Sequence, residues 1–302
     1  MDIVVVGCGA VGLMLSAVFA SQGHIPTVAC LSESSLQLLR HGRVVVHSNG
    51  TTQEVRVEAK RLAPPALRDA DAIVLAVPLN ILEQVAANVA QVSKAKSVVL
   101  VQPSPYALDV AESLGLGGRV SYAMLYTCAV REGHRVHSVR EGSLLAVSGP
   151  ASSLFEAAPP ALFERVKLLP ESKLLGELWA YSSSHALVGS VAAILGVPAS
   201  RIGPSQSATL LLESLVSEAE LVASQLGVDS DIRGAVARML SMRGCVPKLA
   251  RDLEAGRQTE AEYMLGYIIR KGVEKGVYTP RLETVYLAIR ALTETMRKVA
   301  SG

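Results

Sequence analysis

The stretch DIVVVGCGAVGLMLSAVFASQG, residues 2–23, decides the fold. It opens with a short run rich in β-branched side chains and closes with a mostly apolar segment that stops at Gly23. Between the two lies GCGAVG, in which Gly7, Gly9 and Gly12 are spaced as G-x-G-x-x-G. This order predicts a strand, a glycine turn and a helix.

Glycines with this spacing, between a strand and a helix, are typical of a dinucleotide-binding turn. The first permits the tight turn, the second lets a pyrophosphate approach the backbone, and the third lets the helix pack close to the strand. The helix N-terminus also offers free N–H groups to phosphate. A turn with purely structural glycines is the alternative. The residues predicted to bind a cofactor here are Gly7, Gly9, Ala10, Val11 and Gly12.

The segment after the second predicted strand, which begins at Pro26, bears on which cofactor is bound. Glu33 could bind the ribose hydroxyls of NAD. Serines could instead bond the 2′-phosphate of NADP, with arginines nearby for charge, although serines here could equally cap a helix. We predict NADP with Ser32 and Ser34 as contacts, and NAD remains open. The residues considered for a phosphate are Ser32, Ser34, Ser35, Arg40 and Arg43.

Further strands and helices alternate through the first half of the chain. Residues 42–48 and 53–59 predict a hairpin around Asn49-Gly50. A buried strand over 69–78 precedes a helix over 79–92, and a strand over 97–102 ends at Gln102, which we include among the cofactor contacts. Weaker strands follow to about Val147. This alternation predicts a doubly wound α/β sheet.

The chain changes character after about Pro170, where helical periodicity replaces alternation. We therefore expect a Rossmann-type NAD(P)-binding domain over 1–167 and a helical substrate and dimerisation domain over 168–302. The uncharged run 178–200 is long enough to span a bilayer. Its first half, however, is crowded with serines, a tyrosine and a histidine, and Gly196 and Pro198 interrupt its end. A helix buried inside protein is the prediction, and no membrane span is expected.

Composition excludes several classes of function. Of the 302 residues, 50% are hydrophobic and 19% are charged, a composition that suits large cores. The formal net charge is +2. No basic block suggests a nucleic-acid partner. The four cysteines form no CxxC pair and no Cys/His cluster with metal-ligand spacing, so we expect no metal and a reduced cytoplasmic protein. The N-terminus also lacks the features of a signal peptide.

A second motif lies near the other end of the chain. Residues 252–260 read D-x-x-x-G-R-x-T-E, a helix with Gly266 follows, and residues 276–280 read G-V-x-T-P. Together with the glycine fingerprint, this chain resembles the ketopantoate reductase (2-dehydropantoate 2-reductase) family. The resemblance implies a Rossmann domain followed by a helical domain, as in 6-phosphogluconate dehydrogenase-like folds. It also implies NADPH-dependent reduction of a 2-oxo acid, frequent dimers, and Glu260 as an active-site carboxylate, with a solvated helix-start glutamate as the alternative.

The chain departs from the family pattern where the substrate binds. Aligned with W-x-K-x-x-x-N-x-x-x-N from Trp179, Tyr181 stands in place of the catalytic lysine, and His185 and Gly189 stand in place of two asparagines. Pro78 replaces another family lysine, residues 103–106 replace an N-G-x-G turn, and Lys248 replaces a serine upstream of the GR motif. The resemblance therefore implies a substrate other than ketopantoate.

The replacements suggest a different site chemistry. Because they are four residues apart, Tyr181, His185 and Gly189 share one helix face, flanked by Ser184. A tyrosine hydroxyl or a histidine could donate the proton, and Gly189 would clear space for a bulkier substrate. A packed surface between helices, with serines and histidine bonded to carbonyls, is the alternative. The predicted catalytic residues are Tyr181, His185 and Glu260, and the predicted substrate contacts are Ser184, Gly189, Lys248 and Asp252.

Two functions follow from these patterns. The first is an NADPH-dependent reductase of a C=O or C=N bond in a small molecule, with imine reductases as one related kind, working as a homodimer. The second is a non-redox dinucleotide-binding protein on the same scaffold, either a cyclase, an isomerase or a sensor.

Overall fold

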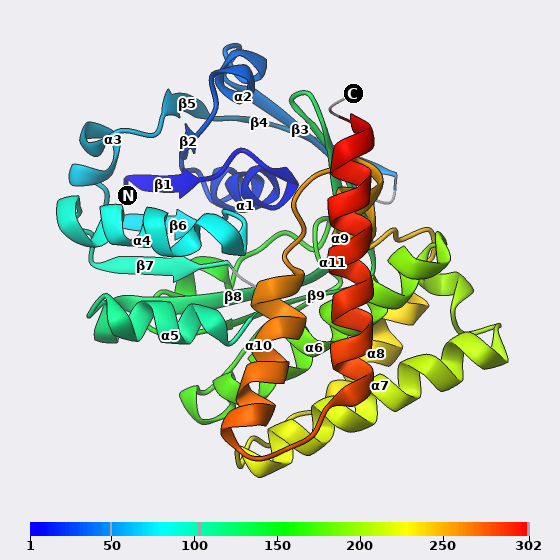
Figure 1. Ribbon diagram of the computed structural model, residues 1–302. Helices are drawn as coiled ribbons and strands as arrows, with labels where there is room; N and C mark the ends of the chain where they lie inside the picture. The colour runs from blue at the N-terminus through cyan, green and yellow to red at the C-terminus, as the bar shows by residue number, and fades with distance from the viewer. Residues whose placement is uncertain (49, 102–103, 301–302) are drawn as a thin grey trace. The chain divides into compact units, whose positions relative to one another are not determined.

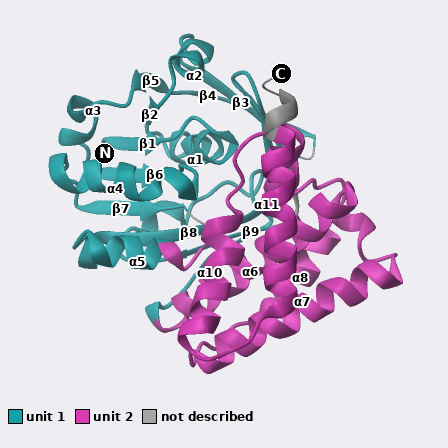
Figure 2. Cartoon of the chain, in the orientation of Figure 1, with its two compact units in different colours: residues 1–102, 107–171 teal, residues 103–106, 172–302 magenta. Residues whose placement is uncertain are grey.

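The computed structural model describes residues 1–48, 50–101 and 104–300. The chain divides into two compact units, one of residues 1–102 and 107–171 and the other of residues 103–106 and 172–302 (Figure 2). Sequence patterns place the domain boundary after residue 167, and this division falls after residue 171. Each unit is described by itself.

The first unit is built on one mixed sheet. Within the described residues, ten strands pair in the order β4-β3-β9-β8-β7-β6-β1-β2-β5, with β10 on β9. The strands are β1 (Ile3–Val6), β2 (Thr27–Cys30), β3 (Arg43–Ser48), β4 (Thr51–Arg56), β5 (Glu58–Arg61), β6 (Ala72–Leu75), β7 (Ser97–Leu100), β8 (Val120–Glu132), β9 (Arg135–Ser148) and β10 (Arg165–Leu168).

The centre of this sheet is parallel and doubly wound. On one side of β1 the sheet continues through β2 to β5, and on the other side it continues through β6 and β7 to β8. The strand order thus reverses at β1, and ligands of open α/β sheets bind beyond the carboxyl ends of strands at such a reversal. The predicted Rossmann-type fold with a helical second part is confirmed.

Helices connect the strands of the first unit. Figure 1 shows α4 beside β6. The helices are α1 (Ala10–Ser21), α2 (Glu33–Leu38), α3 (Pro64–Arg68), α4 (Leu79–Val92) and α5 (Tyr106–Ser113), with 3₁₀ turns at Gly117–Arg119 and Ser152–Phe155. The side chains of β1 and β6 are buried throughout, as continuous apolar runs in a covered parallel sheet must be. Phe19 of α1 packs edge to face against Phe155, with 5.5 Å between the two ring centroids.

The antiparallel part of the sheet differs from the sequence prediction in two ways. The weak strands expected before residue 147 are the long hairpin β8–β9, which turns at Gly133 with φ +64°. The predicted hairpin forms between β3 and β4, although Asn49 lies outside the described residues. The expected strand over 53–59 is wrong as one element. Strand β4, which pairs with β3, ends at Arg56, and after the buried Val57 the chain continues as β5, which pairs with β2.

A disulfide joins the ends of the two strands beside the glycine turn. Cys8 follows β1, Cys30 ends β2, and their Cα atoms are 5.4 Å apart in the bonded pair. Both side chains are buried. The expectation of reduced cysteines is therefore wrong for this pair. Spacing along the chain gave no warning, because parallel pairing of β1 with β2 brings together residues 22 positions apart.

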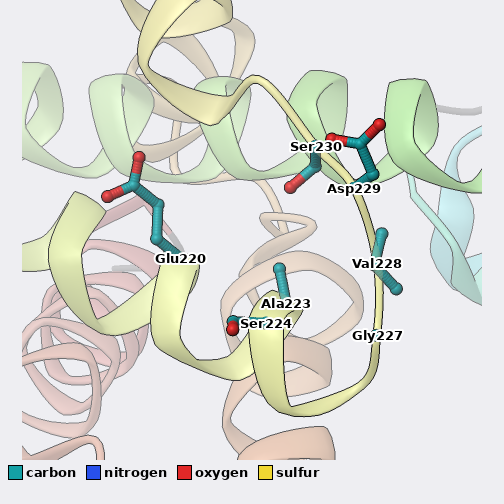
Figure 3. A pocket seen from close by; sticks show the side chains of 7 residues that line it. All are labelled: Glu220, Ala223, Ser224, Gly227, Val228, Asp229 and Ser230. Carbon is teal, nitrogen blue, oxygen red and sulfur yellow. The ribbon is translucent and has the colours of Figure 1, made fainter.

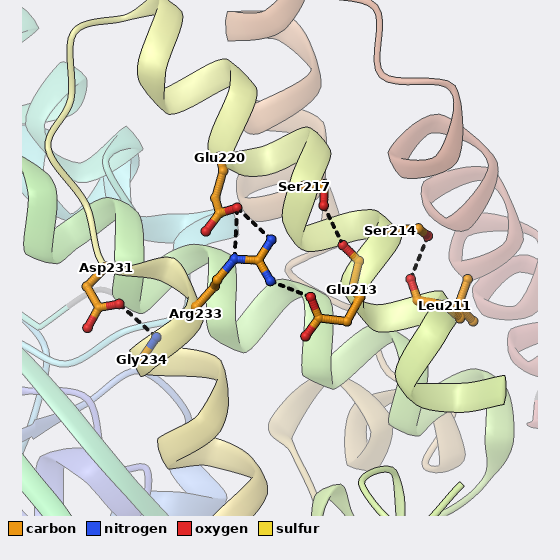
Figure 4. Close-up of polar contacts among 8 residues, drawn as sticks. All are labelled: Leu211, Glu213, Ser214, Ser217, Glu220, Asp231, Arg233 and Gly234. Carbon is orange, nitrogen blue, oxygen red and sulfur yellow. Dashed lines mark hydrogen bonds and ion pairs between the residues drawn. The ribbon is translucent and has the colours of Figure 1, made fainter. Parts of the chain in front are cut away.

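The second unit is helical. Its helices are α6 (Glu171–Leu195), α7 (Gln206–Gln225), α8 (Ile232–Ser241), α9 (Lys248–Glu254), α10 (Ala261–Glu274) and α11 (Pro280–Ala300), with a 3₁₀ turn at Ala199–Arg201. Figure 4 shows Arg233 of α8 between Glu213 and Glu220 of α7. The buried Glu218 carboxylate accepts from the backbone N–H groups of Arg281 and Leu282, so it satisfies the start of α11.

Helix α6 contains the uncharged run 178–200 up to Leu195. By length and composition it is the one described helix that could cross a membrane, yet 78% of its apolar window is buried inside the protein. The run contributes Leu187, Val188, Val191 and Ala192 to the core, all with no exposed surface. This burial is what the prediction of a packed interior helix requires.

Removing the disulfide should lower stability without altering the fold. We expect the double variant Cys8→Ala/Cys30→Ala to lose about 2–4 kcal/mol of unfolding free energy, because the bond closes a loop in the unfolded chain. Urea unfolding followed by circular dichroism measures the loss. Linked Cys8 and Cys30 peptides in a non-reducing digest provide the control, and equal midpoints for both proteins would contradict the expectation.

Candidate functional site

The glycine turn after β1 is shaped by two close approaches. Gly7 has φ +115°, and a Cβ built on it would lie 2.2 Å from the carbonyl oxygen of Ala76. A Cβ on Gly12 would lie 2.0 Å from the carbonyl oxygen of Gly7. No side chain fits at either position, so both glycines are required by the fold.

Gly9 differs from its two neighbours. Its φ of −74° and ψ of 175° suit any residue, and a Cβ built on it meets no heavy atom within 4 Å. It precedes α1 without a capping side chain, so the first N–H groups of α1 have no side-chain acceptor there. Neither backbone nor packing explains this glycine, and a cradle that a Cβ would fill suits the close approach of a phosphate.

The serines after β2 occupy the start of α2. The Ser32 hydroxyl accepts from the Ser35 N–H at 3.3 Å, as the helix-cap alternative expects, and lies 3.3 Å from the Ser34 hydroxyl. Of the arginines considered, Arg40 is exposed and Arg43 pairs with Glu54 on the exposed hairpin. Arg131 of β8 approaches Ser35 instead, although no sequence signal pointed to it. Gln102 lies outside the described residues.

A charged cluster forms in the second unit around the D-x-x-x-G-R-x-T-E motif. The Lys248 ammonium lies 2.6 Å from Asp252 and 2.8 Å from Glu260, and Arg257 lies 2.8 Å from Asp252. Gly256, with φ +62°, reverses the chain after α9, which lets Arg257 return to Asp252. The sequence prediction named three members of this cluster, and the structure brings them together.

The electrostatics of this cluster centre on Lys248. Both carboxylates are nearly buried, whereas half of the Lys248 side chain is exposed. Burial lowers the pKa of the ammonium, but Glu260 and Asp252 outweigh it and the pKa is raised. Lys248 therefore stays charged at neutral pH. The two carboxylates engage two of its three N–H donors, so a third can reach a ligand.

The predicted face of α6 is buried. Tyr181 is 7% exposed, and its ring centroid lies 4.1 Å from that of His185. The Tyr181 carbonyl accepts from the Ser184 hydroxyl at 2.8 Å and from the His185 Nδ1–H at 2.9 Å. This is the backbone bonding that the packing alternative expects. The buried hydroxyls of Ser182 and Ser183 have no hydrogen-bond partner in the described part of the chain.

Two observations bear on the roles predicted for this face. Burial lowers the pKa of His185 to about 4, and its bond to the Tyr181 carbonyl only partly offsets this. A neutral imidazole that donates from Nδ1 is not a general acid at neutral pH. Gly189 does not clear space for a substrate, because a Cβ there would lie 3.3 Å from Leu249 and 3.6 Å from Pro247. It lets α6 pack against the start of α9, beside Lys248.

The surface hollows lie elsewhere. One of about 400 Å³ lies between the end of α7 and the loop that follows it, and it is lined by residues including Glu220, Ser224 and Asp229 (Figure 3). A second, of about 680 Å³, borders the exposed hairpin and includes His41, Arg43 and Arg56. Of the residues considered for the site, only Arg43 lines one of these two hollows.

Comparison with known families adds to this geometry. The family model described as ketopantoate reductase PanE/ApbA matches residues 3–147, and the model of its C-terminal part matches residues 173–293. The chain belongs to the ketopantoate reductase family. Membership makes it an oxidoreductase of a family that uses a nicotinamide dinucleotide. No curated protein sequence matches this family member.

Solved structures share the fold over almost the full length. A PanE/ApbA family ketopantoate reductase from Ralstonia eutropha JMP134 has 21% identity and a TM-score of 0.85, covering 98% of this chain and 100% of its own. A D-mandelate dehydrogenase in complex with NADH and anilino(oxo)acetate has 17% identity and a TM-score of 0.85, covering 98% and 99%. A dimeric ketopantoate reductase from Staphylococcus aureus has 17% identity and a TM-score of 0.75, covering 98% and 100%.

Alanine at Gly9 and at Gly12 should have different effects. Gly9→Ala should fold with normal stability but lose at least about tenfold in dinucleotide affinity, because its methyl group enters the phosphate cradle. Gly12→Ala should be destabilised, because its methyl group meets the Gly7 carbonyl. Thermal unfolding and calorimetric titration with NADPH measure both. Unchanged affinity in Gly9→Ala would contradict a phosphate role for this turn.

The neutral His185 should make the protein sensitive to acid. Because the folded-state pKa lies below the unfolded value, the unfolded chain binds the proton first, and stability is lost as pH falls from about 6.5 toward 4. Between pH 7 and 4.5 this group should cost about 2 kcal/mol. His185→Gln should lose less stability over that interval in urea unfolding. An equal loss in the two proteins would show that His185 does not carry this dependence.

Proposed function

We propose that this protein is an NADPH-dependent reductase of a C=O or C=N bond, with a substrate other than ketopantoate. The observation that carries the proposal is the cradle at Gly9, at the strand-order reversal of a fold whose family is redox-active. Neither the backbone conformation nor the packing at this position requires glycine, as a turn kept open for a phosphate would allow. A bound nicotinamide would supply the hydride.

The remaining roles fall to residues of the second unit. Lys248 is charged, half exposed and held by Glu260 and Asp252, so it can donate to a substrate carboxylate or to the oxygen that gains charge. Glu260 acts by fixing the ammonium. With His185 neutral and Glu260 paired with Lys248, Tyr181 is the predicted catalytic residue left to donate the proton, and the ring of His185 packs against its ring.

Several features support a substrate other than ketopantoate. Tyr181, His185 and Gly189 stand at positions where the resemblance expects a lysine and two asparagines, and Gly189 is occupied by packing against α9. The D-mandelate dehydrogenase of similar fold is in complex with anilino(oxo)acetate, a carboxylate whose 2-oxo carbon carries a phenylamino group. Bulky 2-oxo acids are therefore the first substrates to test, followed by ketones and cyclic imines. A cytoplasmic homodimer is part of the same proposal.

Turnover of the reduced cofactor tests the proposal. The purified protein should oxidise NADPH, followed by absorbance, with at least one member of a panel of 2-oxo acids, ketones and cyclic imines. Tyr181→Phe should then lower kcat about 10²-fold, because a general acid contributes about that much. Tyr286→Phe is the matched control, since its hydroxyl bonds Glu262 outside the predicted site.

Tight NADPH binding with no turnover of any compound in that panel would favour the second function. The protein would then be a dinucleotide-binding cyclase, isomerase or sensor. Full activity in Tyr181→Phe would remove the assigned proton donor while leaving the reductase activity in place.

A further inference from the structure

Arg131 occupies an unusual position near the end of β8. Its Nε donates to the Gly133 carbonyl at 2.6 Å, and its Nη1 donates to the Cys8 carbonyl and, at 3.3 Å, to the Ser35 hydroxyl. Its Nη2 atom is buried and has no hydrogen-bond partner in the described part of the chain. The guanidinium thus connects the glycine turn after β1 with the start of α2 after β2.

The charge of Arg131 is not balanced. Every bond it makes in the described structure goes to a neutral oxygen, and no carboxylate pairs with it. Burial lowers its pKa. A partly buried guanidinium with two unused N–H groups costs free energy unless an anion binds it. By contrast, Arg43 and Arg233 are both neutralised by glutamates.

The place of Arg131 in the fold indicates which anion. In Rossmann-type sheets the dinucleotide pyrophosphate lies at the turn after the first strand, and the adenosine ribose lies beyond the end of the second. Arg131 touches both segments, at Cys8 and at Ser35. The Cys8–Cys30 disulfide joins the same two strand ends. A phosphate on the ribose 2′-hydroxyl would therefore lie beside the half-buried Arg131 side chain and the serines of α2, and Arg131 would turn its buried Nη2 toward it.

We propose that Arg131, with Ser35, forms the 2′-phosphate site that makes this chain select NADPH over NADH. This inference rests on the proposed function and identifies the residue that sets its cofactor preference. The arginine comes from β8, about a hundred positions along the chain from the serines. Its planar donor edge suits a phosphate better than a lysine would.

Binding measurements on the full-length protein test this site. Calorimetric titration with NADPH, NADH, adenosine 2′,5′-bisphosphate and 5′-AMP gives four dissociation constants without requiring turnover. The wild type should bind each 2′-phosphorylated ligand at least about tenfold more tightly than its partner, because charge-assisted bonds carry roughly 1.5–3 kcal/mol. Arg131→Gln should bring each pair within about threefold while leaving the NADH constant unchanged. Arg135→Gln removes an exposed charge at the start of β9 and should change neither ratio.

The NADH constant separates this role from a structural one. If Arg131 only anchored the Cys8 carbonyl, Arg131→Gln would weaken NADPH and NADH equally, and that result would overturn the inference. Equal wild-type affinities, or a preference that persists in Arg131→Gln, would overturn it too. These results would leave the proposed reductase activity in place, whereas failure of both dinucleotides to bind would remove both that activity and this site.

Discussion

The close approach of α1 to the turn after β1 is the constraint on which the first unit depends. Gly12 lies against the Gly7 carbonyl, and Gly7 lies against the Ala76 carbonyl, so three backbone segments meet with no side chain between them. This contact sets α1 against β1 and β6 at the reversal of strand order. It also leaves the first N–H groups of α1 pointing out at Gly9, where the chain keeps an open cradle. The fold of the first unit and the proposed binding of a dinucleotide therefore depend on the same six residues, 7–12.

The second unit holds its polar groups in a comparable way. Buried carboxylates are satisfied by specific partners, as Glu218 is by the start of α11 and Asp252 is by Lys248 and Arg257. Much of the D-x-x-x-G-R-x-T-E motif thus builds the helical unit. Lys248 differs from these buried groups, because half of its side chain is exposed and its ammonium has a third N–H donor for a ligand.

Much of this could be predicted from sequence, because local patterns carry it. The fingerprint, the parallel strands and the helical second half are all encoded by short-range periodicity and glycine spacing. The contacts that sequence reasoning missed are long-range. Cys8 meets Cys30 only through strand pairing, and Arg131 reaches Ser35 only because β8 extends far along the sheet. The packing around His185 and Gly189 could not be predicted, because helix spacing gives a face and does not tell what covers it.

The central claim is that the turn between β1 and α1 holds a nicotinamide dinucleotide. Hydrogen–deuterium exchange of the full chain, with and without saturating NADPH, tests this most directly, because the uncapped N–H groups of α1 would gain acceptors on binding. The account predicts slower exchange in peptides covering residues 7–13 and 32–35. Unchanged exchange in both segments, with NADPH bound, would contradict it.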